Sequence, residues 1–134
     1  MDSKMKKVYD LIDGYRPAMV SLQAGMTAIP ALGPENDGLG ESEKAAYIEK
    51  WIGKEIGFDI VKHYDAPDDR VPSGVRPNIA AIMKGASSKK RIWVMGHIDI
   101  VPPGDLAKWD TDPYKVVEKD GKVFGRGTED NQHA

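Results

Sequence analysis

Residues 92–99, Ile-Trp-Val-Met-Gly-His-Ile-Asp, constrain the fold of this chain more than any other segment. The first four are continuously apolar, a pattern typical of a strand buried on both faces at the centre of an α/β sheet. A glycine ends the run, and His97 and Asp99 follow with one residue between them. Because residues two apart on extended backbone point to the same side, we expect both side chains at the carboxyl end of a central strand, where open α/β sheets bind ligands.

The spacing of this pair suits a metal site. A histidine that binds a metal through one ring nitrogen usually donates its other N–H to a carboxylate, which fixes the tautomer and the ring orientation. His97 and Asp99 supply both parts. The alternative is that His97 caps the strand and Asp99 is an ordinary loop acid, and the spacing alone leaves both interpretations open.

Composition excludes several classes of partner. The chain has 134 residues, enough for one domain with a core, and its net charge is −2 with both signs interspersed. We therefore expect neither a nucleic-acid interface nor a membrane-binding patch, and the absence of an apolar leader favours a cytoplasmic protein. With no cysteine in the sequence, any metal must be held by His, Asp and Glu, which favours zinc, cobalt or manganese.

The first ninety residues predict two helices and two strands. Apolar residues at three- and four-residue steps predict a helix over 3–24 with Ser3 as its N-cap, and Pro17 predicts a kink or break near residues 13–14. A loop over 25–40 leads to a second helix over 41–56, which Gly57 ends. The buried face of that helix is expected to hold Ala45, Ile48, Trp51, Ile52 and Ile56.

Strands are predicted over 58–64 and 78–83, with a loop over 65–77 between them. His63 lies in the first strand, without a carboxylate in a strand-end context like that of His97, so we interpret it as a surface or edge histidine. The basic residues around the turn at 85–88 are interpreted as a solvated tip.

After the central strand, a long loop reaches Pro113 and carries Trp109, which we expect to plug the loop onto the domain rather than to contact a substrate. Asp120-Gly121 between two alternating runs predicts a β-hairpin.

The last segment, Gly-Arg-Gly-Thr-Glu-Asp over 125–130, brings a second carboxylate. Its two glycines allow a close approach of the backbone, and Asp130 is expected to open a helix with Thr128 as a possible cap. Asp130 would be a good hard ligand for one metal or a bridge between two, and the alternative is a simple N-cap aspartate. His133 could share a helix face with Asp130, but we do not expect it to be a ligand.

Taken together, these motifs resemble the N-terminal part of the co-catalytic zinc amidohydrolases. The resemblance rests on Gly-His-Ile-Asp-Ile-Val-Pro, Trp109, the Asp-Pro at 112–113, the Asp-Gly at 120–121 and Gly-Arg-Gly-Thr-Glu-Asp, in this order and spacing. The family includes acetylornithine deacetylase, succinyl-diaminopimelate desuccinylase, aminoacylase, glutamate carboxypeptidase and related dipeptidases. Asn131-Gln132 stands where many members carry Met-Lys-Gly, which places this chain in a subgroup and leaves its substrate open.

The resemblance implies a fold and a chemistry. It implies the front portion of a three-layer α/β/α catalytic domain with a mixed central sheet. His97 would be a ligand of one metal, Asp99 the acid that orients it, and Asp130 the carboxylate that bridges two zinc ions. The reaction would be hydrolysis of the amide bond of N-acyl amino acids or short peptides by water that two metals activate.

The family's glutamate base, its remaining ligands and its lid or dimerisation domain all lie beyond Asp130. We therefore expect residues 1–134 to be an incomplete N-terminal part of the catalytic domain, inactive alone, with an exposed sheet edge that favours self-association. Two alternatives stay open, a non-catalytic interaction module and a metal-binding module that a partner chain completes.

Overall fold

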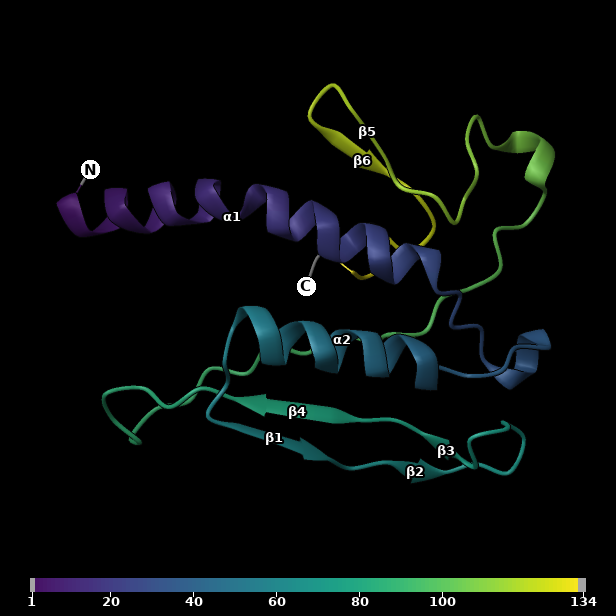
Figure 1. The fold of residues 1–134 in the computed structure, drawn as a ribbon, viewed down its shortest axis with the longest axis horizontal. Coiled ribbons are helices and arrows are strands. Elements are labelled where there is room, and N and C mark those ends of the chain that lie inside the picture. The colour runs from purple at the N-terminus through teal and green to yellow at the C-terminus, as the bar shows by residue number, and fades with distance from the viewer. Residues whose placement is uncertain (1, 133–134) are drawn as a thin grey trace.

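The computed structural model describes residues 2–132 as a mixed α/β arrangement of helices with small two-stranded sheets (Figure 1). Helix α1, Ser3–Ala28, and helix α2, Ser42–Glu55, lie side by side, and the 3-10 turn η1, Pro34–Asn36, stands between them in the chain. Four short strands follow, then the turn η2, Leu106–Lys108, and a last hairpin. No helix in this part of the chain is long and apolar enough to cross a bilayer.

Helix α1 is longer than the sequence predicts and runs through Pro17 without a break. Its N-cap is Asp2, whose side chain accepts a hydrogen bond from Lys4 N at 3.1 Å, so the prediction of Ser3 as the cap is wrong. A proline inside a helix leaves one carbonyl without its donor, and water can satisfy that carbonyl here because residues 2–17 are exposed. The carboxyl end differs, since Met26 and Thr27 are buried.

Helix α2 follows its prediction to within a residue at each end. Gly57, at φ +67°, directs its N–H to Ile52 O at 3.1 Å and closes the helix as a left-handed C-terminal residue does. Ala45 is buried and Ile56 is exposed, while the other predicted face residues are half-buried.

A largely buried ion pair joins Glu41, at the start of α2, to Arg76 in a later strand. The carboxylate of Glu41 is nearly inaccessible to water and accepts two hydrogen bonds from the guanidinium of Arg76, one of them from Nε at 2.5 Å. Arg76 Nη1 also lies 3.6 Å from Asp68. The hydrogen bond to the Glu41 carboxylate raises the pKa of Arg76, so its guanidinium stays charged.

The strands form three separate antiparallel pairs. β1, Ile60–His63, pairs with β4, Ile79–Ile82, and this hairpin extends into β2, Ala66–Pro67, and β3, Val75–Arg76. β5, Val117–Lys119, pairs with β6, Lys122–Phe124. Between them Asp120 and Gly121 have φ values of +52° and +71°, which confirms the predicted hairpin and its two-residue turn with both φ positive.

The predicted central strand is absent. Residues 92–99 form no strand, and the four apolar side chains are exposed rather than buried, between 73% at Trp93 and 94% at Ile92. Within residues 92–100, the bridge to another described segment is at Ile100, which pairs in parallel with Leu32. A strand buried on both faces needs a neighbour on each side, and within residues 2–132 no other strand pairs with this segment.

The Glu41–Arg76 pair gives a test of what holds α2 to the strands. Substitution of Glu41 by Ala should lower the free energy of unfolding by about 2–4 kcal/mol, because it leaves a partly buried guanidinium without its main acceptor. Urea denaturation followed by circular dichroism measures the loss. The matched control is Glu43→Ala, which removes an exposed acid of the same helix turn and should cost less than about 1 kcal/mol. Equal losses in the two variants would contradict the assignment.

Candidate metal site

His97 lies between two carboxylates, one on each ring nitrogen. Its Nδ1 is 3.0 Å from Asp99 Oδ1 and 3.2 Å from Asp99 O, and its Nε2 is 2.9 Å from Asp130 Oδ1. The structure thus brings together all three residues that the sequence singled out. Because a neutral imidazole has one N–H and cannot donate to both carboxylates, this arrangement favours the doubly protonated ring.

The charges around His97 move its pKa in one direction. The hydrogen bond to Asp130 raises the pKa of His97 above its ordinary value, and the carboxylate and backbone carbonyl of Asp99 act in the same sense. The imidazole is half-exposed and Asp130 is 76% exposed, so salt screens part of this attraction.

The segment that carries His97 and Asp99 is fixed at its carboxyl end against the loop that follows α1. Ile100 is buried, and its N–H donates to Ala31 O at 3.0 Å. Gly127 packs on Ile100, since a Cβ at this glycine would lie 2.8 Å from Ile100 Cγ2, and its φ of +84° also favours glycine. Gly127 therefore approaches the segment of His97 and Asp99 closely at Ile100.

The segment that carries Asp130 is held by the carboxyl end of α1. Thr27 is fully buried and donates its hydroxyl to Gln132 Oε1 at 3.0 Å, while Gln23 Nε2 donates to Thr128 O at 3.3 Å. Gln132 N also donates to Gly127 O at 3.0 Å, which closes a turn around Asp130. The end of α1 therefore positions a carboxylate about a hundred residues further along the chain.

The expected helix at Asp130 is not found. Residues 126–132 are turns, and Thr128 directs its hydroxyl back to Gly125 O at 2.9 Å instead of capping a helix. The side chain of Asp130 therefore contacts His97 and does not cap a helix within residues 126–132. His133 lies outside the described residues.

Trp109 fixes the loop that follows His97 and Asp99. Its indole N–H donates to Pro103 O at 3.0 Å, and the guanidinium of Arg126 stacks 5.2 Å above its ring while also donating to Pro103 O at 3.2 Å. Arg126 precedes Asp130 by four residues, so this contact ties the loop to the segment that carries the second carboxylate. The interpretation of Trp109 as a plug agrees with these contacts.

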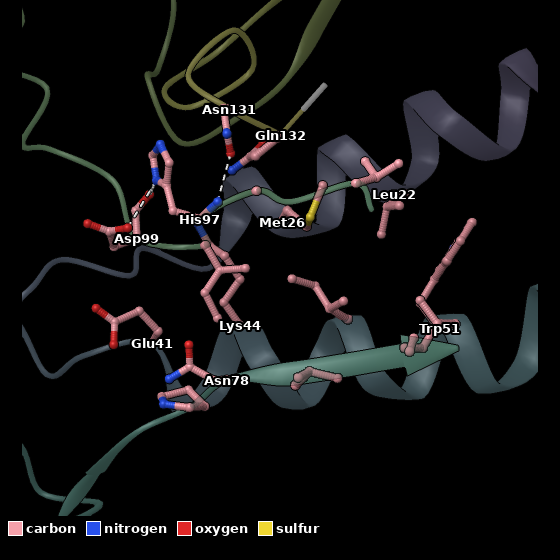
Figure 2. Close-up of a pocket in the computed structure, with 18 of the residues that line it drawn as sticks. Leu22, Met26, Glu41, Lys44, Trp51, Asn78, His97, Asp99, Asn131 and Gln132 are labelled. Atoms are coloured by element: carbon pink, nitrogen blue, oxygen red, sulfur yellow. Dashed lines mark hydrogen bonds and ion pairs between the residues drawn. The ribbon is translucent and has the colours of Figure 1, made fainter. Parts of the chain in front are cut away.

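A cavity of about 590 Å³ opens beside the site (Figure 2). Apolar side chains of α1, α2 and β4 line one end of it, and the other end holds Glu41, Lys44, Asn78, His97, Asp99 and Gln132. Lys44 is fully buried and points from α2 toward the His97–Asp99 segment, and its Nζ has no hydrogen-bond partner within the described residues. Burial lowers the pKa of Lys44 to about 8, and the charges of Asp99 and Glu41 oppose the shift.

The contacts of His97 are suited to a metal. Two donor atoms on a tetrahedral zinc lie about 3.4 Å apart, so the 2.9 Å between His97 Nε2 and Asp130 Oδ1 requires only a small opening to admit an ion. Asp99 faces the opposite nitrogen, where a second carboxylate orients a ligating histidine. Across residues 2–132, however, no group of three or more His, Cys, Asp or Glu side chains is placed to hold a metal.

The other described histidine provides a comparison. His63 is exposed at the end of β1, as expected for a surface histidine, but it also has two carboxylates that the sequence interpretation did not foresee. Its Nε2 lies 2.9 Å from Glu49 Oε1 and its Nδ1 lies 3.8 Å from Asp65. The hydrogen bond to Glu49 raises the pKa of His63. A histidine between two acids is thus not sufficient to identify a site in this chain.

Two site residues escaped the sequence interpretation. Asn131 Oδ1 accepts a hydrogen bond from the backbone N–H of His97 at 3.1 Å. The asparagine stands directly after Asp130, where many members of the family carry methionine, and this difference could have pointed to it. Lys44 stands three residues after Glu41 and four before Ile48, which puts it on the buried stripe of α2. That spacing could have identified it.

Comparisons with known proteins find metallohydrolases and peptidases. An established family model, described as Peptidase family M20/M25/M40, matches residues 93–133. An uncharacterized metallohydrolase of Methanocaldococcus jannaschii is 34% identical over 115 residues, which cover 84% of this chain. A succinyl-diaminopimelate desuccinylase of Cupriavidus taiwanensis is 40% identical over 80 residues, which cover 58% of this chain.

A solved structure extends the likeness to the fold. The di-peptidase Dug1p of Saccharomyces cerevisiae matches 98% of this chain with a TM-score of 0.77 and 28% sequence identity. The matched regions are only part of these proteins. This chain spans 28% of the length of the metallohydrolase, 20% of the desuccinylase and 29% of the dipeptidase chain.

The raised pKa of His97 yields a prediction with a definite sign. Asp130→Asn should lower this pKa toward its ordinary value, because it removes the largest stabilisation of the imidazolium, and Asp99→Asn should lower it less. Protons then compete with a metal for His97 Nε2 only at more acidic pH. Titration of the imidazole C–H signals by NMR measures both shifts, with His63 as the internal reference because its acids are untouched. A His97 pKa unchanged by Asp130→Asn would contradict the described contact.

Proposed function

This chain belongs to the M20/M25/M40 peptidase family, and we propose that it supplies His97, Asp99 and Asp130 to a metal-dependent amide hydrolase. The substrates proposed are N-acyl amino acids or short peptides. One observation carries the proposal: His97, which lies 2.9 Å from Asp130 and 3.0 Å from Asp99, stands inside the segment 93–133 that matches the family model, whereas His63 with its two acids lies outside that segment.

Each of the three residues has a role that its contacts support. His97 would offer its Nε2 lone pair to a metal while its Nδ1–H donates to Asp99, which holds the ring in the required tautomer. Asp130 would contribute a carboxylate to one metal, or bridge two. When bound, a pair of zinc ions would polarise the carbonyl of the scissile amide and activate a water; cobalt or manganese could replace zinc.

The substrate class comes from the relatives. One is named for removing a succinyl group from succinyl-diaminopimelate and another for cleaving dipeptides. The cavity beside His97 joins an apolar end to a polar one, which suits an amino-acid derivative with an apolar side chain. We therefore place the scissile amide at the polar end, next to His97.

The remaining ligands and the general base must come from elsewhere. Zinc takes about four ligands, and His97 and Asp130 supply two of them to one ion. We propose that further segments of the same protein complete the site, so that residues 1–134 form an N-terminal part of the catalytic domain. A partner chain that supplies these ligands is the second candidate, because both described ligands stand half-exposed or exposed and remain open to another protein.

Activity measurements separate these cases. The 134-residue chain and the product of its complete reading frame are assayed with N-acyl amino acids and dipeptides, with zinc, cobalt or manganese. We expect no metal-dependent turnover by the 134-residue chain alone. The complete product should be inactivated by a chelator and restored by metal, and His97→Ala or Asp130→Ala should reduce kcat/KM at least about 100-fold.

The control is His63→Ala, which removes a histidine with similar carboxylate contacts outside the site and should leave kcat/KM within about twofold. Turnover by the 134-residue chain at the rate of the complete product would contradict the need for further ligands. Turnover by the complete product that resists chelation would contradict the metal-dependent mechanism itself. Activity that appears only after a second protein is added would favour the partner-completed site.

We also propose that the isolated chain self-associates through residues 92–95. These four side chains form a contiguous exposed apolar run, and such patches associate in water. Light scattering should show species larger than a monomer, and Val94→Lys should reduce their fraction because it places a charge in the patch. Ser21→Lys, at an exposed polar position of α1, is the control for added charge alone. A chain that stays monomeric at all concentrations would contradict this proposal.

A further inference from the structure

Asn131 forms a hydrogen bond between the two segments that carry the candidate ligands. Its Oδ1 accepts the backbone N–H of His97 at 3.1 Å, across 34 residues of chain. Figure 2 shows the Asn131 side chain reaching the main chain of His97, while the imidazole extends away from that contact. The amide therefore leaves both ring nitrogens free for Asp99 and for a metal.

The hydrogen bond from the His97 main chain to Asn131 differs from the contact of the His97 ring with Asp130. The bond from His97 Nε2 to Asp130 Oδ1 requires a proton between the two atoms. A metal would take the place of that proton, because both atoms must offer lone pairs to it. The bond from the His97 main chain to Asn131 uses neither lone pair, so it can persist when a metal binds.

Asn131 is itself fixed from its carboxyl side. The next residue, Gln132, donates its backbone N–H to Gly127 O at 3.0 Å and accepts the buried hydroxyl of Thr27 at 3.0 Å. The buried end of α1 thus holds the backbone beside Asn131, and the Asn131 amide transmits that position to His97. Asp130 is joined directly to Asn131, so one short segment sets the place of both ligands.

We propose that Asn131 is a positioning residue that sets the separation of His97 from Asp130 for metal binding. The inference rests on the metal site under "Proposed function" and adds a residue to it. Asn131 touches neither the metal nor the substrate in this account. It limits the movement of the His97 main chain, which lowers the conformational entropy lost when the two ligands converge on an ion.

The test measures zinc binding by the 134-residue chain at pH 8. Zinc chloride is titrated into the ¹⁵N,¹³C-labelled chain while the signals of the His97 ring and amide are followed by NMR. Asn131→Leu keeps the approximate size of the side chain and removes the acceptor, so the zinc Kd should rise about 10- to 100-fold and the His97 amide should lose its protection from hydrogen exchange. Asn131→Asp retains an acceptor and should keep both close to the wild-type values, or bind zinc more tightly.

Three controls make the result specific. Asn36→Leu alters a half-buried asparagine of η1 that is remote in sequence from both ligand segments, and should leave the zinc Kd unchanged. Glu129→Gln removes one exposed negative charge next to Asp130 and measures how much a single charge changes the zinc Kd. This change is subtracted from the effect of Asn131→Asp, which adds one negative charge. Urea midpoints of all variants separate loss of zinc affinity from loss of folding.

Each outcome decides the inference. Weak zinc binding by Asn131→Leu at an unchanged urea midpoint, with recovery in Asn131→Asp beyond the charge effect, supports it. Wild-type affinity in Asn131→Leu overturns the inference alone, and so does a loss that merely parallels the urea midpoint. A wild-type chain whose His97 signals do not respond to zinc contradicts the proposed metal site, and the inference with it.

Discussion

The contact between His97 and Asp130 is the central interaction of this structure, because the surrounding segments hold these two residues in place. It joins two segments that are 33 residues apart, and neither segment belongs to a helix or a strand. What holds them is the carboxyl end of α1 and the loop that follows it. The hydroxyl of Thr27 in α1 donates to Gln132, and Ala31 O in the loop accepts from Ile100 N. Irregular backbone can position functional side chains in this way when its polar groups are satisfied by a regular element.

Sequence reasoning was most successful where the chemistry is local. The His-x-Asp spacing predicted the Nδ1 contact to Asp99, the Asp-Gly pair predicted the turn between β5 and β6, and the stripe of α2 predicted its bounds closely. Asn131 and Lys44 were missed because their roles depend on segments far away in the chain, although each stood in a position that carried a signal. The pairing of His97 with Asp130 came from the family resemblance, since no local pattern relates residues so distant.

The predictions of a buried central strand and of a fully packed α1 failed for the same physical reason. Each needs neighbouring segments to pack against, and the described residues do not provide them. An apolar run predicts a buried strand only when other backbone is available to pair with it, and none of the described strands pairs with residues 92–95. The same holds for α1, whose amphipathic pattern predicts packing that its exposed first half does not make. The predicted three-layer domain with a central sheet is therefore reduced here to helices and separate hairpins. Lys44, whose Nζ has no hydrogen-bond partner among residues 2–132, lines the same cavity as Asp99 and Glu41.

The central claim is that His97 and Asp130 bind the same metal ion. A crystal of the chain grown with zinc, measured above and below the zinc absorption edge, tests it most directly. The account predicts one anomalous peak within about 2.2 Å of both His97 Nε2 and an Asp130 carboxylate oxygen, with Asp99 still bonded to Nδ1. A peak at His63 and its acids instead, or zinc bound to His97 with Asp130 turned away, would contradict it.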